Sequence, residues 1–250
     1  YNPVEIDSLN ADLVVTCESG KVSGRSIRGN VTVRNSYEAV QLQQVGGNVD
    51  VNGNSCTLQI RQVQGEVRAV SSYNPVEVES VKGQVTIEAE SAGVTVRDVK
   101  ADVSVRSSYN PIQVSGVKGN VRVNSQAGDV LVNDTGGDIA IENSYNKVEI
   151  RRSSGSIVIN SEGSPVEVKE IARLAKPSFI DITTTMNPIT LYLPGQLAVA
   201  LSAKTEYGKI RSDYPVYLDE PEEHRPAPVA GREGIPVRLQ TDGDITVRKQ

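Results

Sequence analysis

The sequence is 250 residues long, carries a formal net charge of −5, and contains one Phe, one Met, one His and no Trp. The acidic balance argues against a nucleic-acid partner, because phosphate binding requires a basic surface, and it gives no reason to expect binding to anionic lipid. Valine dominates the apolar residues, and Gly, Ser and Asn are frequent. β-Branched residues separated by turn formers predict an all-β protein.

Short strands at a nine-residue spacing are predicted from the start of the chain to Ile171. Each strand is an apolar-x-apolar triplet whose alternate side chains face a core, and the rest of each nonapeptide turns the chain. Successive triplets are one nonapeptide apart, or two where the Val22 and Val67 units keep only their first apolar residue. The triplets begin at Val4, Leu13, Val31, Val40, Val49, Leu58, Val76, Val85, Val94, Val103, Ile112, Val121, Val130, Ile139, Val148, Ile157 and Val166. This repeat predicts a single-stranded β-helix, or β-solenoid.

Two kinds of corner alternate between the strands. One has an apolar residue followed two positions later by Gly or Ala, and it recurs in every second nonapeptide, as in Val45 with Gly47 and Val63 with Gly65. The other is either a small-residue corner or a tyrosine-headed corner. The tyrosines recur in every fourth nonapeptide: Tyr1, Tyr37, Tyr73, Tyr109 and Tyr145. The repeat therefore permits an 18-residue coil with two strands or a 36-residue coil with four.

Charge favours the 18-residue coil. Stacked coils place equivalent residues about 4.8 Å apart, where like charges repel. A 36-residue coil would stack Arg25, Arg61 and Arg97 directly on one another. An 18-residue coil interleaves them in the favourable order Asp7, Arg25, Gln43, Arg61, Glu79 and Arg97. We therefore expect about thirteen such coils, forming a rod roughly 60 Å long.

The periodicity weakens after Ile171. It resumes at Ile180–Ile182 and at Ile189–Leu191, where Met186-Asn187-Pro188 is a degenerate version of the tyrosine corner. Further strands of irregular spacing are expected, and the Pro-rich, charged segment Asp219–Gly234 is predicted to be a solvated loop. Because solenoids need atypical terminal repeats, we interpret residues 1–171 as the regular solenoid and 172–250 as irregular C-terminal coils and cap of the same domain.

Several motifs of the second half resemble the bacterial DUF4097 family of adhesin-like proteins. They are Leu191-Tyr192-Leu193-Pro194, Thr205-Glu206-Tyr207-Gly208-Lys209-Ile210 and Thr241-Asp242-Gly243-Asp244-Ile245-Thr246-Val247. The resemblance implies a single-chain β-helix of a bacterial cell-envelope protein, periplasmic or extracellular, and offers no catalytic residues. Since Tyr1 lies in the middle of a repeat, we expect a preceding segment, outside this chain, that anchors the full-length protein to a membrane.

No set of residues predicts catalysis or calcium binding. β-Helix enzymes that act on polysaccharides need clustered carboxylates beside a sugar cleft. Here Glu5, Glu77, Glu149 and Glu167 occupy the outward middle positions of separate triplets, which is typical of a solvated sheet face. Calcium-binding nonapeptide repeats require a longer glycine-aspartate signature than the single partial match Gly136-Gly137-Asp138-Ile139.

Zinc, nucleophilic catalysis and phosphate binding are equally unsupported. His224 is the one histidine, and Cys17 and Cys56 lack the spacing of metal ligands and are too few for a disulfide framework. Corners such as Gly46-Gly47 lack the following helix and lysine of a phosphate-binding loop, so we interpret them as tight turns. We therefore expect no cofactor, no metal site and no enzymatic activity.

The row of tyrosines has two alternative interpretations. It could be an aromatic strip that binds sugars or a partner protein, or each ring could pack over its own corner, held by the following Asn-Pro. We favour packing, because aromatic ladders commonly fix strand register. Buried rings in the structure would exclude the strip as a binding surface.

The leading functional hypothesis is a non-enzymatic envelope β-helix that serves as an adhesin-like binding platform or a structural scaffold. Its partner would be a cell-surface glycan or an envelope protein, and its coil ends would permit end-to-end self-association. The alternative is a carbohydrate-active enzyme with a site in the irregular region, near Tyr207, Tyr214, Tyr217 and Glu222. A deep acidic pocket in that region would favour the enzyme.

Overall fold

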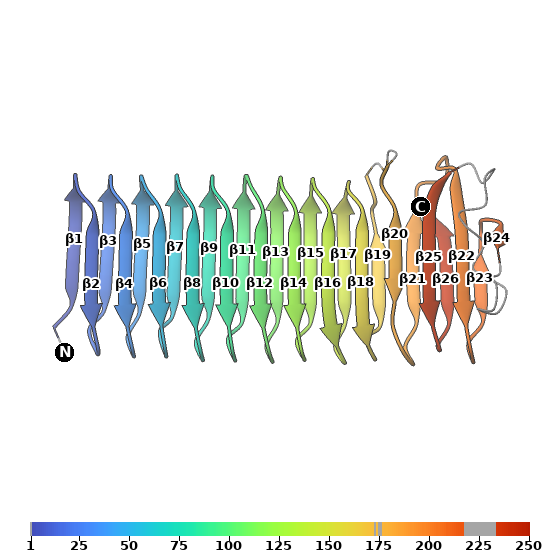
Figure 1. Cartoon of the computed structure of the whole chain (residues 1–250), viewed down its shortest axis with the longest axis horizontal. Helices are drawn as coiled ribbons and strands as arrows, with labels where there is room; N and C mark the ends of the chain where they lie inside the picture. Colours follow the sequence, from blue (N-terminus) through green and yellow to red (C-terminus); the bar gives the residue numbers. More distant parts are fainter. Residues whose placement is uncertain (1, 173, 175–176, 218–233) are drawn as a thin grey trace.

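A computed structural model shows an all-β solenoid in which two parallel sheets of 13 strands each face one another (Figure 1). The structure describes residues 2–172, 174, 177–217 and 234–250. Within those residues there is no helix. Successive strands alternate between the two sheets in the regular part, so one coil consists of one strand from each. The prediction of an all-β solenoid is confirmed.

The first sheet contains the odd-numbered strands of the regular coils. Its spatial order is β1 (Val4–Leu9), β3 (Val22–Ile27), β5 (Val40–Val45), β7 (Leu58–Val63), β9 (Val76–Val81), β11 (Val94–Val99), β13 (Ile112–Val117), β15 (Val130–Thr135), β17 (Val148–Ser153), β19 (Val166–Lys169), β21 (Ile189–Leu193), β26 (Ile245–Lys249) and β23 (Ile210–Ser212).

The second sheet contains the even-numbered strands of the regular coils. Its spatial order is β2 (Leu13–Cys17), β4 (Val31–Asn35), β6 (Val49–Gly53), β8 (Val67–Ser71), β10 (Val85–Ala89), β12 (Val103–Ser107), β14 (Val121–Ser125), β16 (Ile139–Ser144), β18 (Ile157–Glu162), β20 (Ile180–Thr183), β25 (Ile235–Thr241), β22 (Val199–Thr205) and β24 (Val216–Tyr217).

The register confirms the 18-residue coil. Val4 is opposite Val22, Val22 is opposite Val40, and the same offset continues through β18. The alternative 36-residue coil is therefore excluded. The pairs along the outer face run in the alternating order expected from charge: Asp7, Arg25, Gln43, Arg61, Glu79 and Arg97.

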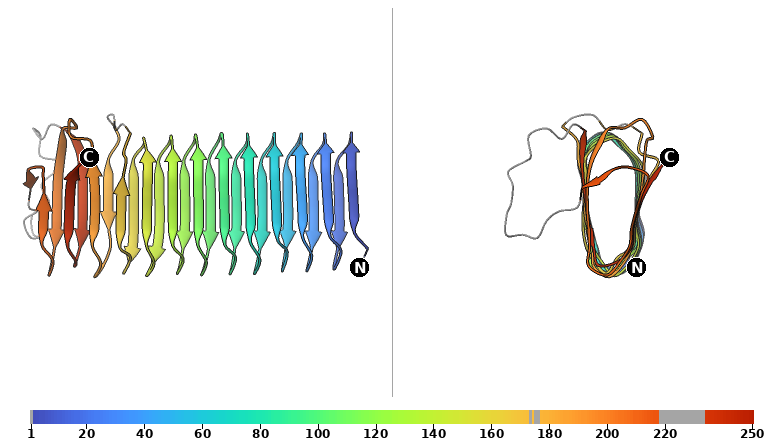
Figure 2. Two further views of the ribbon diagram at one scale, coloured as in Figure 1. Left: turned by 180° about the vertical axis from the view of Figure 1, so that it is seen from behind. Right: turned by 90° about the vertical axis from the view of Figure 1, so that its right-hand side faces the viewer.

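The core is a set of continuous apolar rows, one for each inward position of the coil. Seen end-on, the regular coils overlie one another in a single flattened outline (Figure 2). The triplet residues of β11, Val94 and Val96, are 1% and 0% exposed, and Val99 at the end of that strand is 0% exposed. Each buried valine contacts its equivalents in the coils before and after, so each coil depends on its neighbours for stability.

The corner after each odd strand is built from glycine, or alanine at Ala101, and from the side-chain oxygens of Asn and Asp. Gly83 lies directly over Gly65, and a Cβ added at Gly83 would lie 2.5 Å from the Gly65 carbonyl oxygen. The next position forms a ladder, in which the backbone N–H of Asn48 donates to Asn30 Oδ1 (2.9 Å) and that of Glu66 donates to Asn48 Oδ1 (2.9 Å). These contacts explain the Gly signature that recurs once per coil.

A bend near the end of each odd strand was not predicted. One residue per coil has a positive φ, between 49° and 68°, and is skipped by the strand pairing, so that the next side chain turns back into the core. The non-glycine residues in this row are Ser8, Ser26, Gln44, Gln62, Ser80, Asp98, Asp134, Arg152 and Glu170. The bend places the last apolar residue of the strand, such as Val45 or Val63, in the core.

One core row changes from apolar to polar in the middle of the rod. The row that contains Val99 and Val117 continues with Thr135 and Ser153, which are 2% and 0% exposed, and the hydroxyls of both lack a hydrogen-bond partner. A buried polar group without a partner destabilises the fold.

We therefore expect Thr135→Val to raise the free energy of unfolding by about 1 kcal/mol, because it removes an unpaired hydroxyl and keeps the branched shape. Urea denaturation monitored by circular dichroism measures the difference. Thr95→Val, at an outward position, is the matched control and should change stability little. Equal or lower stability of Thr135→Val would contradict the expectation.

The last three coils are not stacked in chain order. β25 pairs with both β20 and β22, and β26 pairs with both β21 and β23. Residues 235–249 therefore form a coil inserted between the coil of β20 and β21 and the coil of β22 and β23 (Figure 1). The side chain of Gln250 secures this coil, because its amide accepts from Glu170 N (2.8 Å) and donates to Ile171 O (2.9 Å).

The alternation of inward and outward side chains continues beyond the regular repeat. Between Ile180 and Lys249, the described residues contribute seven strands to the same two sheets. The degenerate corner at Met186-Asn187-Pro188 has the expected position between β20 and β21. The predicted loop at Asp219–Gly234 lies outside the described residues except for Gly234.

Candidate functional site: the tyrosine edge

The tyrosine corners connect every second even strand to the odd strand that follows it. At the corner between β8 and β9, the buried Ser71 hydroxyl donates to Asn74 O (3.1 Å), and Asn74 Nδ2 donates to Ser55 O of the preceding coil (2.6 Å). The equivalent Asn110 donates to Ser91 O (2.7 Å). Serine and asparagine thus hold the corner by polar contacts, and the tyrosine between them is not required for packing.

The tyrosine rings are accordingly exposed. Tyr37, Tyr73, Tyr109 and Tyr145 are 64%, 62%, 62% and 68% exposed. The expectation that each ring packs over its own corner was wrong, because the hydrogen bonds of Ser and Asn hold the corner in place of the ring. Tyr1 lies outside the described residues. The exposed rings form what we call the tyrosine edge, which runs along one narrow side of the solenoid.

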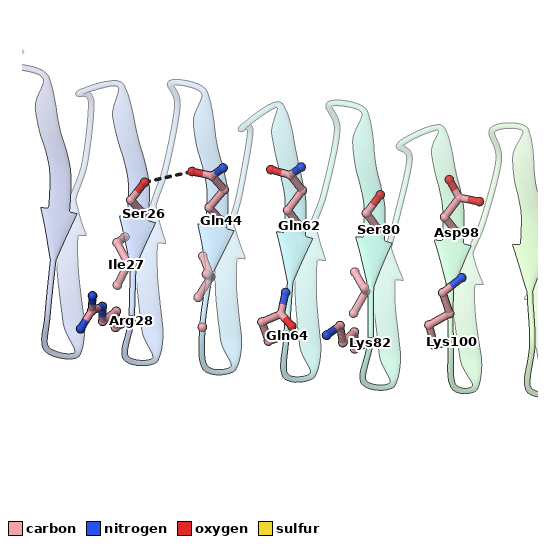
Figure 3. Close-up of a pocket in the computed structure, with 13 residues that line it drawn as sticks. Ser26, Ile27, Arg28, Gln44, Gln62, Gln64, Ser80, Lys82, Asp98 and Lys100 are labelled. Carbon is pink, nitrogen blue, oxygen red and sulfur yellow. Dashed lines mark hydrogen bonds between the residues drawn. The ribbon is translucent and has the colours of Figure 1, made fainter.

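A groove lies beside the corners of the opposite narrow side (Figure 3). Ser26, Gln44, Gln62, Ser80 and Asp98 line one side, and Arg28, Gln64, Lys82 and Lys100 line the other. Its floor consists of Ile27, Val45 and Val81, which are 1% exposed. Of the thirteen residues that line the groove, Asp98 is the one acid, so the groove lacks the pair of carboxylates that glycoside hydrolysis requires.

The outward glutamates are not all solvated as predicted. The side chain of Glu149 is 13% exposed and is surrounded by cations: Lys169 Nζ lies 2.9 Å from Oε1, Lys147 Nζ lies 3.1 Å from Oε2, and Arg151 also contacts Oε1. Burial by itself would raise the pKa of Glu149, but hydrogen bonds from Lys169, Lys147 and Arg151 outweigh it and lower the pKa to about 2. Glu167 shares Lys147 and Lys169, and its pKa is also lowered.

Glu149→Gln is expected to lower the free energy of unfolding at pH 7 by about 1–2 kcal/mol, after allowance for solvent screening. The folded-state pKa lies below the unfolded one, so the stabilisation is present above about pH 4.5 and is lost as pH falls toward 2. Urea denaturation at pH 7 and pH 3 measures the effect. Glu77→Gln, with a half-exposed side chain in the same triplet position, should cost less. An equal cost for both variants, or a difference independent of pH, would contradict this account.

Both cysteines are free thiols, and they differ in environment. Cys56 is buried and donates to Asn35 O (3.2 Å), whereas Cys17 is half-buried. Burial raises the pKa of the Cys56 thiol to about 11, which keeps it protonated and unreactive at neutral pH. Within the described residues no group of three or more His, Cys, Asp and Glu could hold a metal ion.

The residues predicted for an enzymatic site do not come together in the described part of the chain. Tyr214 is 8% exposed, and its hydroxyl donates to Pro194 O (2.9 Å), so it packs into the end of the solenoid. Tyr207 is 82% exposed. The side chain of Tyr217 and all of Glu222 lie outside the described residues. Neither Tyr207 nor Tyr214 lines the groove of Figure 3.

The stacked coils, the Gly corners and the closing strands agree with one known family. The sequence model described as "Toastrack DUF4097" matches residues 94–248, which is more than half of the chain. The chain belongs to the Toastrack family. No curated protein and no solved structure matches it.

The Toastrack match covers the coils from β11 to β26 and includes two exposed tyrosines of the regular repeat, Tyr109 and Tyr145. It therefore spans both the regular coils and the inserted coil. None of the described residues forms a helix long and apolar enough to cross a lipid bilayer.

Proposed function

We propose that this Toastrack solenoid is a non-enzymatic, adhesin-like binding platform of the bacterial cell envelope, and that the tyrosine edge contacts the ligand. The observation that carries the proposal is the exposure of four tyrosine rings, 62–68%, at corners that do not need them for packing. Tyrosine is enriched at interaction sites, because its ring packs against a partner while its hydroxyl stays hydrated.

The groove of Figure 3 and the surroundings of Glu149 also favour binding over catalysis as the role of the described coils. The groove of Figure 3 contains one acid, and the charge of the partly buried Glu149 is balanced by Lys147, Lys169 and Arg151. A lowered carboxyl pKa is the opposite of what a general acid needs at neutral pH. The backbone pairing between coils makes the rod stiff, which preorganises a long edge for an extended partner.

The proposal also covers how this Toastrack solenoid is attached to the cell and where it is located. We propose that a segment outside this chain anchors the solenoid to a membrane, so that the rod projects the tyrosine edge into the periplasm or the exterior. A cell-surface glycan and an envelope protein are the partner classes that such a location offers. If the edge binds nothing, the same rod acts as a structural spacer.

The test compares wild-type protein with the triple variant Tyr37→Ser, Tyr73→Ser and Tyr109→Ser on a glycan array and in pull-downs from envelope extracts. The matched control is Lys82→Ser, Lys100→Ser and Lys118→Ser, which removes three exposed side chains from similar coils at the opposite corners. Unchanged thermal unfolding of both variants shows that the rod is intact.

Binding that is lost in the tyrosine variant and kept in the lysine variant supports the proposal. Binding that is kept in the tyrosine variant overturns the assignment to this edge. Absence of any ligand overturns the platform and leaves the spacer.

A further inference from the structure

The tyrosine edge extends beyond the regular repeat because of the inserted coil. Met186 occupies the corner between β20 and β21, where Asn187 Nδ2 donates to Gly163 O of the coil before (2.8 Å), and Met186 is 74% exposed. Its φ of 59° resembles the 69° of Tyr145, so the two corners have the same local conformation. The inserted coil follows with Gly243, and a Cβ added there would lie 2.9 Å from Asn187 O.

Tyr207 lies one coil further. Its backbone N–H donates to Asp242 O of the inserted coil (3.3 Å), and its ring is 82% exposed. Large exposed side chains therefore occupy every second coil along the whole described edge: Tyr37, Tyr73, Tyr109, Tyr145, Met186 and Tyr207. In the regular coils between them the same position holds a small residue: Ser55, Ser91, Ala127 and Gly163. In the inserted coil it holds Asp242, which lies between Met186 and Tyr207. Without the inserted coil, Tyr207 would be adjacent to Met186 and the alternation would be broken.

The spacing and straightness of this row restrict the shape of a ligand. Two coils rise by about 9.6 Å, twice the distance between neighbouring strands. The corners overlie one another in the end-on view, so the row is close to straight (Figure 2). The row thus presents exposed side chains, aromatic except at Met186, at a regular interval that is close to the length of a disaccharide in an extended glycan chain. A straight row with that repeat fits an extended polymer better than a compact protein.

The charge of the edge selects against anionic polymers. The residues that flank the rings are mostly Ser and Asn, and the charged residues of these corners include Glu38, Glu90 and Glu162. Lys147, which follows Tyr145 and Asn146, is already paired with Glu149 and Glu167. Carboxylates repel a polyanion, and they also oppose face-to-face pairing of two copies along this edge. An uncharged ligand is not repelled by these carboxylates.

We infer that the tyrosine edge binds an uncharged, extended β-linked polysaccharide that lies along the rod, with every second sugar stacked on a side chain of the row. This inference rests on the proposed function and names its ligand class. In a β-1,4-linked chain the sugars alternate in orientation, so every second sugar presents the same face to the edge. The apolar C–H face of a pyranose packs against a tyrosine ring, and corner hydroxyls and amides accept or donate hydrogen bonds to the sugar hydroxyls. Each contact is weak, and the row gains affinity by multivalency.

The test measures dissociation constants by titration calorimetry for β-1,4-linked gluco- and N-acetylglucosamine oligosaccharides of two, four, six and eight sugars. We expect affinity to rise stepwise with each added pair of sugars, and Tyr73→Ser to weaken binding of the octasaccharide by about tenfold. Amylose, an α-linked glucan, and polygalacturonate, a polyanion, should bind at least about tenfold more weakly. Affinity that is independent of length, or equal for amylose, would overturn the inference.

Ser91→Tyr separates spacing from aromatic area. It adds a ring in the gap between Tyr73 and Tyr109. The substitution leaves the backbone hydrogen bond from Ser91 N to Ser72 O in place, so the corner should keep its conformation. If the two-coil spacing matters, this variant weakens octasaccharide binding. If aromatic area alone matters, the variant strengthens binding and the inference is wrong.

The outcomes distinguish this inference from the proposed function. Tyrosine-dependent binding of an envelope protein or of an anionic glycan, without binding of these oligosaccharides, overturns the ligand class and leaves the platform standing. Concentration-dependent dimers in light scattering that disappear in the triple tyrosine variant would show a second copy as the occupant, which also overturns the ligand class. If no ligand binds in a way that depends on the tyrosines, both the ligand class and the proposed binding platform are overturned.

Discussion

Val96→Asp is expected to lower the free energy of unfolding by more than about 4 kcal/mol, the largest effect of a single substitution considered for this rod. Val96 is 0% exposed and lies between Val78 and Val114 of the adjacent coils. A carboxylate there would have no partner, and a packed row offers no path to solvent. Because each coil is stabilised by its neighbours, the loss should spread to the coils on both sides.

Urea denaturation and amide hydrogen exchange measure this effect. The matched control is Ser104→Asp, which places the same charge at an outward position of the other sheet, opposite Arg122. It should change stability by less than about 0.5 kcal/mol. A melting temperature of Val96→Asp equal to that of the wild type would contradict the stacked-core account.

Leu239→Asp is expected to release the end of the solenoid while the regular coils remain folded. Leu239 is 1% exposed in β25 and lies between Ile182 of β20 and Ala203 of β22. β22 pairs with β25 and with the short strand β24, and β23 pairs with β26. When the inserted coil is disrupted, β22 and β23 lose the strands that connect them to the rest of the sheets.

Hydrogen exchange resolved by mass spectrometry tests this dependence. We expect exchange in β22 and β23 to rise on the order of a hundredfold, although neither strand contains the substitution, and exchange in β1 to β18 to stay unchanged. Gln240→Glu, next to Leu239 and opposite Lys204, is the control and should have no such effect. If β22 and β23 stay protected while β25 is released, they dock directly on β20 and β21 and the inserted coil is not required.

The regular coils could be predicted from the sequence because one residue type recurs at one period. Triplets such as Val94-x-Val96 and Val103-x-Val105 stack in a single register, and a shift by one residue would turn every valine outward. The opposed charges of Arg61 and Glu79 then distinguish an 18-residue coil from a 36-residue one. Periodicity and charge together therefore determine this part of the fold.

The order of the last coils has no comparable signal. Leu201 in β22 and Leu239 in β25 belong to strands with the same alternation, and either strand would bury similar side chains against β20. Which strand pairs with β20 depends on contacts between distant segments, such as the hydrogen bond from the Gln250 side chain to Ile171 O. The positive-φ bend could not be predicted from the sequence either, because residues such as Gln62 and Arg152 rarely adopt a left-handed conformation and so do not indicate one.

The tyrosine edge could be located but not characterised from the sequence. The spacing of Tyr73 and Tyr109 predicts a row, yet whether the rings are buried depends on what else holds the corner. The bonds made by Ser71 and Asn74 supply that support, and they are visible only when adjacent coils are in place.

The size of the coil and the wider spacing of the tyrosines together limit how such a rod can change in length. The strand pairing by itself would allow one more coil to be added at any point of the regular part, because adjacent strands pair in the same register. A gene duplication of a single coil, however, would place two tyrosine corners, or two small corners, next to each other and shift the rest of the row. A duplication of two coils adds about 9.6 Å and preserves the pattern. A rod that keeps an evenly spaced edge would therefore have to lengthen in pairs of coils, in agreement with the recurrence of the tyrosine corner at every second coil.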